Sequence, residues 1–218
     1  MLGFFTGKGP HRQFVRDRDI DLSPPGKDGN VIFRDTHFVD CRFERTGPWP
    51  FALTDCVFER CRFRMTRSYA KHFWTDSRFI DCDFVMRSAS ALWFQAGETF
   101  RNCRFEGTLK GSRFDAQGRA GMIDGLDLSA LKVDLVEFRD GAWNDTVLLP
   151  PWPAMLVTAV LKAGDPRLDS LPRRIAELAT LTRPGEVVLY DLARMKAGEE
   201  ERWEALKRAD WVRHAPAP

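Results

Sequence analysis

The segment FVDCRF at residues 38–43 returns three times, as FERCRF at 58–63, FIDCDF at 79–84 and FRNCRF at 100–105. The copies begin 20, 21 and 21 residues apart. A short motif that returns at a nearly fixed interval is typical of a chain that completes one circuit and stacks each residue on its counterpart in the next. The repeat therefore predicts a solenoid.

Inside each circuit, large apolar residues recur at every fifth position, and a mostly small residue stands two positions before each. The first two circuits supply Phe33, Phe38 and Phe43, then Leu53, Phe58 and Phe63. The small partners are Val31, Thr36, Cys41, Cys56 and Cys61, with Phe51 as an exception. Two inward residues in every five indicate a coil with sides of five residues.

This pattern resembles the pentapeptide-repeat family, whose motif centres on Leu or Phe with Ala, Cys, Ser, Thr or Val two residues earlier. The match covers about residues 31–145. The resemblance implies a mainly β fold, a right-handed quadrilateral parallel β-helix with four five-residue sides per coil. About five and a half coils are expected, with the central residue of each side and its small partner both pointing inward.

The five-residue step assigns the central residues to sides. The first side stacks Phe33, Leu53, Phe73, Phe94 and Phe114; the second stacks Phe38, Phe58, Phe79 and Phe100; the third stacks Phe43, Phe63, Phe84 and Phe105. The fourth side has its centres at Pro48, Ser68, Ala89 and Lys110. Because none of these four is a large apolar residue, we expect the fourth side to be irregular.

The chain divides into three parts. Residues 1–30 are rich in Gly, Pro and Asp and are expected to cap the first coil of the β-helix, which spans residues 31–147. The prolines of LLPPWPAM at 148–155 end the strand pattern. Residues 148–218 are predicted to be an α-helical cap or small domain, with helices at about 170–182, 186–196 and from 199. The apolar stretch 155–161 is predicted to be a fourth short helix or a strand docked on the last coil.

No segment approaches the roughly 18 consecutive apolar residues of a membrane-spanning helix. The opening MLGFFTGKGPHRQF has an apolar run that is too short for a secretory signal peptide. We therefore expect a cytoplasmic protein, and the family resemblance implies a bacterial one.

All five cysteines stand two residues before a central phenylalanine, where the coil needs a small buried side chain. Cys41, Cys61, Cys82 and Cys103 are expected to form a column with one thiol per layer. We interpret them as packed, reduced thiols; disulfide formation between neighbours stays open on distance alone. No short CxxC hook points to a zinc site, so no metal and no cofactor is expected.

The sequence gives little reason to expect an enzyme. The four histidines, His11, His37, His72 and His214, are scattered over the chain, and no pair has metal or triad spacing. The phosphate-binding, dinucleotide-binding, metalloprotease and nucleophile-elbow motifs are all missing.

Two groups of outward residues are candidate partner-binding sites. The first is an aromatic group beside the fourth side, Trp49, Tyr69, Trp74 and Trp93, with Arg67 nearby; Trp74 and Trp93 are expected to face out because they adjoin inward Phe73 and Phe94. The alternative is that loops or the C-terminal region cover these aromatics. The second is the stripe Arg42, Arg62, Asp83 and Arg104, which salt bridges between coils would also explain.

The charge balance separates the candidate functions. Residues 31–140 hold 17 Lys and Arg against 16 Asp and Glu, and residues 151–218 hold 11 against 10. The pentapeptide-repeat proteins that protect DNA gyrase resemble DNA, which requires dense negative charge. We therefore expect first a non-enzymatic protein-binding module, such as an immunity protein that occludes a toxin or target enzyme. Gyrase binding comes second, and a β-helix that carries a functional helical region is a further alternative. Nucleic acid and membrane are not expected partners, and the C-terminal helices are expected to support a homodimer.

Overall fold

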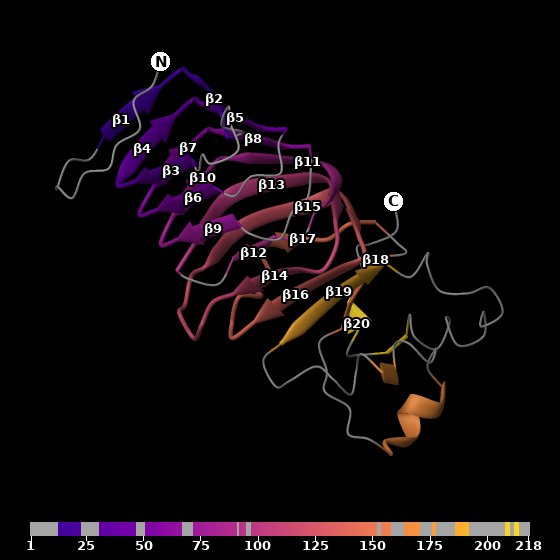
Figure 1. Cartoon of the computed structure of the whole chain (residues 1–218). Helices are drawn as coiled ribbons and strands as arrows, with labels where there is room; N and C mark the ends of the chain where they lie inside the picture. Colours follow the sequence, from indigo (N-terminus) through magenta and orange to yellow (C-terminus); the bar gives the residue numbers. More distant parts are fainter. Residues whose placement is uncertain are drawn as a thin grey trace.

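The computed structural model describes residues 13–22, 31–46, 51–66, 72–90, 92–94, 97–151, 154–157, 164–170, 176–177, 186–191, 208–209 and 212–213. They form a parallel β-solenoid whose strands stack along one axis, as Figure 1 shows.

Short strands make up the sides of the coils. The first side contains β3 (Val31–Arg34), β6 (Phe51–Thr54), β9 (His72–Thr75), β12 (Trp93–Phe94), β14 (Ser112–Asp115) and β16 (Leu135–Arg139). The second side contains β1 (Gln13–Arg16), β4 (Thr36–Val39), β7 (Val57–Glu59) and β10 (Arg78–Ile80), and the third contains β2 (Asp19–Asp21), β5 (Arg42–Arg45) and β8 (Arg62–Met65).

Three longer strands, β11 (Asp83–Ser90), β13 (Thr99–Leu109) and β15 (Ile123–Val133), continue around the corners of the coil (Figure 1). β13 and β15 pair along the second side, the third side and the fourth, where Leu109 pairs with Ser90 and Val133. Leu109 is buried. In the later coils the fourth side is therefore centred one residue before the predicted Lys110.

The interior consists of stacked aromatic rings. On the second side, Phe38, Phe58, Phe79 and Phe100 stack with centroids 5.0–5.1 Å apart and nearly parallel planes. On the third, Phe43, Phe63, Phe84 and Phe105 stack at 4.3–4.9 Å. All eight rings are fully buried. These two columns confirm the predicted registers of the second and third sides.

Backbone geometry restricts which residue types can occupy the corners of the coil. Ten described non-glycine residues have positive φ, and seven of them are aspartates, such as Asp35, Asp40, Asp55 and Asp81. A short polar side chain is tolerated in this left-handed region because it makes local hydrogen bonds, whereas most L-residues clash there. The Asp that precedes a small inward residue is therefore a sequence signature of these corners.

The column of cysteine thiols contacts backbone carbonyl oxygens of its own coil and of the coil before it. The Sγ of Cys82 lies 3.4 Å from the carbonyl oxygen of Phe58 in the coil before it and 3.3 Å from that of Ile80. Cys61 and Cys103 repeat the arrangement with the carbonyls of Phe38 and Phe79. All five cysteines are free and buried. Burial raises the pKa of Cys56 to about 11, so its thiol is protonated at neutral pH.

The first-side prediction is wrong in the third coil. Leu53 pairs with Trp74, and Phe73 pairs with the outward position Ala52. Trp74 is 3% exposed and packs edge-on against Phe51, Phe63 and Phe79. The extra residue of this circuit precedes Trp74, because the five-residue step from Trp74 leads to Phe79 and Phe84. Trp74 is therefore a core residue, contrary to our expectation.

The ladders begin before residue 31. β1 and β2 pair in parallel with β4 and β5, which places Val15 opposite Phe38 and Ile20 opposite Phe43. These two strands lie within the segment 1–30 that we expected to be a cap. The second side thus carries six layers, from β1 to β15.

The predicted α-helical C-terminal region is wrong. Its described elements are β17 (Val147–Leu148), β18 (Ala154–Val157), β19 (Val187–Asp191), β20 (Val212–Arg213) and the short 3-10 helix η1 (Pro166–Ser170). β19 occupies residues 187–191 of the second predicted helix, which spanned 186–196. In the stretch 155–161, predicted to be a helix or a docking strand, the described residues 155–157 belong to strand β18. The other two predicted helices lie mostly outside the described residues. A homodimer through such helices is not proposed further.

The C-terminal strands continue the first side. β19 runs antiparallel to β16, and the sheet continues through β18 to β20 (Figure 1). Leu189 is fully buried opposite Val136. Val187, Val188 and Leu189 are all buried, and the β-branched valines suit a strand, so this contact outweighs local helix propensity. No helix among the described residues is long and apolar enough to cross a membrane.

Candidate functional site

The outward residues of the third side stand in two columns, because side chains alternate across each strand. The residues before the central phenylalanines pair in the order Asp19, Arg42, Arg62, Asp83, Arg104 and Asp127. The residues after them pair in the order Asp21, Glu44, Arg64, Val85 and Glu106. The third side is thus a charged, regularly spaced face.

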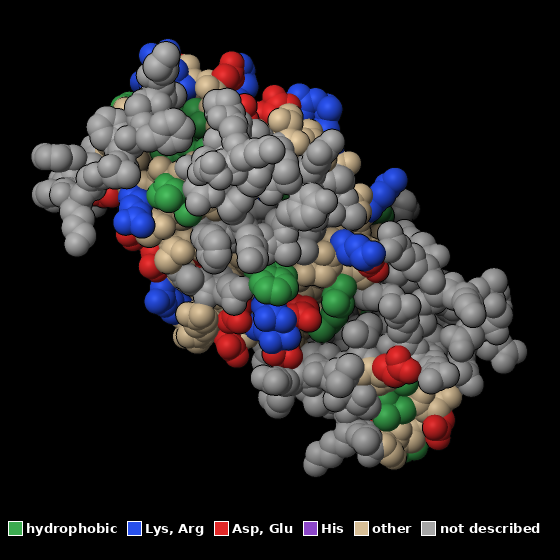
Figure 2. All heavy atoms as spheres, in the orientation of Figure 1, with side chains coloured by type: hydrophobic (Ala, Val, Ile, Leu, Met, Phe, Trp, Pro, Cys, Tyr) green, Lys and Arg blue, Asp and Glu red, His purple; other side chains and the backbone are tan. Residues whose placement is uncertain are grey.

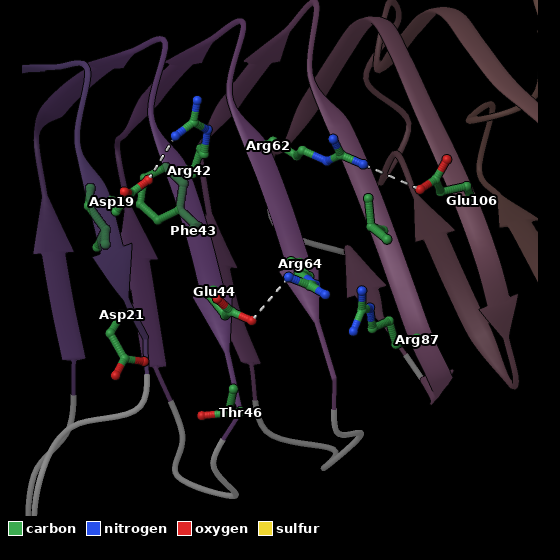
Figure 3. Close-up of a pocket in the computed structure, with 12 residues that line it drawn as sticks. Asp19, Asp21, Arg42, Phe43, Glu44, Thr46, Arg62, Arg64, Arg87 and Glu106 are labelled. Atoms are coloured by element: carbon green, nitrogen blue, oxygen red, sulfur yellow. Dashed lines mark hydrogen bonds and ion pairs between the residues drawn. The ribbon is translucent and has the colours of Figure 1, made fainter.

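A hollow of about 760 Å³ lies on this face, and we call it the third-side groove. Its lining residues come from five successive strands, β2, β5, β8, β11 and β13, as Figure 3 shows. They are Asp19, Ile20, Asp21, Arg42, Phe43, Glu44, Thr46, Arg62, Arg64, Val85, Arg87 and Glu106. The floor is the backbone of the ladder, which fixes the spacing of the side chains.

Ion pairs cross the groove between coils (Figure 3). Arg42 Nη1 lies 3.4 Å from Asp19 Oδ1, and Arg64 Nη1 lies 3.6 Å from Glu44 Oε1. The guanidinium of Arg62 reaches across Val85 to Glu106 at 3.6 Å. These side chains are 38–79% exposed, so each pair contributes only about 0–1 kcal/mol and a ligand can displace it at little cost.

The groove is electrically asymmetric. Its first two coils contribute three carboxylates, from Asp19, Asp21 and Glu44, and one guanidinium. The next two contribute three guanidiniums to the lining, from Arg62, Arg64 and Arg87, and the fifth contributes the carboxylate of Glu106, which pairs with Arg62. Arg87 is exposed, and Figure 3 marks no ion pair between it and the other labelled residues of the groove. An acidic pole and a basic pole therefore lie along the solenoid axis, with Val85 as an apolar contact within the basic pole.

A buried arginine lies behind the acidic pole. Arg45 faces inward from β5 in line with Met65 and Met86, is 1% exposed, and places its guanidinium 5.4 Å from the centre of the Phe51 ring. Burial lowers the pKa of Arg45 to about 10, so it keeps its charge at neutral pH.

The corner beside the groove is fixed by a separate ion pair. Arg60 donates two hydrogen bonds to Asp40, at 2.7 and 3.0 Å. The hydrogen bond from Arg60 lowers the pKa of Asp40, although both groups are at the surface. Asn102 donates to Asp81 at 3.1 Å two coils further on. This corner forms a border of side-chain hydrogen bonds along the groove.

The predicted arginine stripe is present. Arg42, Arg62 and Arg104 share one column with Asp83, and Arg42 and Arg62 line the groove. Arg104 pairs instead with Asp127 at 3.7 Å. The salt bridges between coils, which were the alternative explanation of this stripe, are also present. Partner binding by these residues stays a prediction.

The structure contradicts the outward position predicted for one member of the aromatic group, Trp74. Trp74 is in the core, and Trp49, Tyr69 and Arg67 lie outside the described residues. Trp93 faces out and is 47% exposed, as predicted. Its position as a partner contact stays a prediction.

Trp93 is held in one orientation. Its Nε1 donates to the carbonyl of Gly111 at 3.1 Å, and Arg113 lies over its ring at 5.7 Å. Arg113 bonds Glu137 at 2.8 Å, and Arg139 links Glu137 to Glu186 beside β19. Over β12, β14 and β16, Figure 2 shows hydrophobic atoms beside a basic group flanked by acidic ones.

Metal chemistry has no candidate site in the part of the chain that the structure describes, where no three His, Cys, Asp or Glu residues are grouped to hold an ion. Three thiols of the column are held protonated: burial raises the pKa of Cys41, and hydrogen bonding between thiols together with burial raises the pKa values of Cys61 and Cys82.

Comparison with known proteins assigns nothing further. No family model matches the chain, no curated protein is similar to it at a significant level, and no solved structure resembles it at a significant level.

Sequence reasoning missed Arg64 and Arg87. The signal was available for Arg64, because it follows the central Phe63 just as Arg62 precedes it. Arg87 lies three residues after Phe84, at the turn toward the fourth side, where the repeat pattern carries no information. Only the folded chain shows that these groups surround one hollow.

Proposed function

We propose that this chain is a non-enzymatic protein-binding module of the pentapeptide-repeat type, and that the third-side groove is its binding surface. The observation that carries the proposal is the groove itself: the adjacent strands β8 and β11 hold Arg62, Arg64 and Arg87 around Val85 on one face of the ladder. The ladder fixes the backbone positions of these side chains before a partner binds, and arginine is enriched in protein interfaces.

The finer proposal is an immunity-type role, in which the rod occludes the working surface of a toxin or target enzyme. A stiff stacked face suits this task because it covers a partner without rearrangement. Arg42, Arg62 and Arg104 are proposed as contacts on the third side and Trp93 as a contact on the first. The mixture of both charges along the groove gives no support to gyrase binding by DNA resemblance.

The test is a pull-down from the native bacterial host with matched variants. Arg64→Ala/Arg87→Ala removes two groove cations, and Arg78→Ala/Arg101→Ala removes two exposed cations from the second side. We expect the wild type and the second-side variant to retain the same protein and the groove variant to lose it. A partner retained equally by the wild type and both variants would contradict the proposal. A third variant, Trp93→Ala, tests the first side: a partner lost only by this variant would place the binding site there.

A further inference from the structure

The two poles of the third-side groove restrict what it can bind, and this inference rests on the protein-binding function proposed above. Asp21 belongs to the first layer of the third side and Val85 to the fourth, so three layer spacings separate them. At about 4.8 Å per layer the separation is about 14 Å. Arg87 follows Val85 in the same strand and lines the same hollow.

An extended peptide advances about 3.3 Å per residue, so four residues span about 13 Å. Residues four apart also point to the same face of an extended chain, whereas residues three apart point to opposite faces. A partner segment that runs along the solenoid axis therefore matches both poles only if its two charges are four residues apart.

The sign of the charges follows from the poles. Arg64 and Arg87 offer planar guanidinium groups, which bind carboxylates through paired hydrogen bonds. Asp19, Asp21 and Glu44 repel an anion at the other end of the groove and attract a cation. A uniform polyanion such as a nucleic-acid strand would meet these carboxylates with its own phosphates, so the observations favour a protein segment that carries both signs.

We propose that the third-side groove binds an extended segment of a partner protein in which one acidic and one basic side chain lie four residues apart. The carboxylate sits between Arg64 and Arg87 beside Val85, and the basic group sits near Asp21. Because either chain direction satisfies this pairing, the proposal fixes the spacing and leaves the polarity of the segment free.

Synthetic peptides of about twelve residues test the spacing directly. One carries Lys and Glu four residues apart in a neutral Ser and Thr background, and a second of identical composition carries them three residues apart. A third carries Glu at both positions. Fluorescence anisotropy should give the first peptide a Kd at least about tenfold lower than the other two, with the difference shrinking at high salt.

Two variants locate the effect. Arg64→Ala/Arg87→Ala should abolish the difference between the peptides, and Arg78→Ala/Arg101→Ala should preserve it. Asp21→Lys replaces one carboxylate of the acidic pole by a cation and should make the peptide with two Glu residues the tightest ligand. Circular dichroism and thermal melting check that each variant is folded.

Equal affinities for the first two peptides, tighter binding of a single-stranded oligonucleotide, or no binding at millimolar peptide would each overturn the inference. A host partner that the groove variant loses, but whose contacting segment lacks the spacing, would overturn this inference alone. A groove variant that retains every partner would overturn the proposed function as well.

Discussion

The core position of Trp74 leads to a sharp stability prediction, because the sequence pattern predicted its neighbour Phe73 as the inward residue. Trp74 is 3% exposed and its ring centre lies 5.1–5.6 Å from those of Phe51, Phe63, Phe79 and Phe94. Truncating a buried Trp removes these contacts and leaves a cavity, which costs about 3–5 kcal/mol. We expect Trp74→Ala to lower the free energy of unfolding by that amount.

Trp93→Ala is the matched control. Trp93 is 47% exposed and its main partners are Gly111 and Arg113, so its loss should cost about 1 kcal/mol or less. Trp74→Phe provides a second control. The indole N–H of Trp74 has no hydrogen-bond partner among the described residues, and Phe removes this unsatisfied donor while it keeps a ring in the stack. We expect Trp74→Phe to stay within about 1.5 kcal/mol of wild type.

The assay is guanidinium unfolding of the three variants and the wild type, followed by circular dichroism. A large loss for Trp74→Ala, with small effects for Trp74→Phe and Trp93→Ala, is the expected result. If Trp74→Ala and Trp93→Ala cost the same, the register assigned to the third coil is wrong, and Phe73 is the core residue instead.

Three further predictions test the corners and the thiols. Gly107→Ala should destabilise the protein by about 3 kcal/mol, because φ is +100° and an added Cβ would meet the carbonyl of Met86. Its control, Gly111→Ala, should cost only about 1 kcal/mol, because φ is +64° and no atom lies within 4 Å of the added Cβ. Equal losses of stability in thermal melts of the two variants would contradict the close packing at Gly107. Arg60→Ala should raise the pKa of Asp40, as measured by NMR titration. Because the pKa of Asp40 is lowered in the folded wild type, the pair stabilises the fold at neutral pH, and this stabilisation is lost as the pH falls through the folded pKa. An unchanged pKa of Asp40 in the variant would refute the contact. The native protein should react with a thiol reagent only after unfolding, because burial raises the pKa of Cys56 to about 11 and all five thiols are buried; rapid labelling of the folded protein would show that the column is open.

The repeat made most of the solenoid predictable from the sequence. Central phenylalanines and their small partners recur at intervals that only a stacked coil explains. In each of the four coils from Phe38 to Phe105, the second-side and third-side phenylalanines are five residues apart and pair in register with those of the next coil. The first side was less predictable, because circuits of 21 residues contain an insertion whose place the spacing does not fix. In the third coil the extra residue precedes Trp74, and in the fourth it follows Phe94. The inward residue was therefore predicted correctly for the pair Trp93 and Phe94 and wrongly for the pair Phe73 and Trp74.

The C-terminal region failed for a different reason. The segment 186–196, followed by Gly198, has the length and end signal of a helix, yet the open edge of β16 offers unpaired backbone groups, and pairing with β19 satisfies them. Such an edge exists only after the last coil has formed. The groove is a similar case, because the sequence showed the stripe of arginines but only the folded chain brings Arg64 and Arg87 to one hollow with Val85.

A photo-crosslinking amino acid placed at position 85 or at position 80 tests most directly whether the third side is the binding face. Val85 and Ile80 are both half-buried outward residues of one coil, on the third and second sides respectively. Irradiation in the native host should link one partner protein to position 85 and none to position 80. Crosslinks at position 80 alone, or at neither position, would contradict a binding site in the third-side groove.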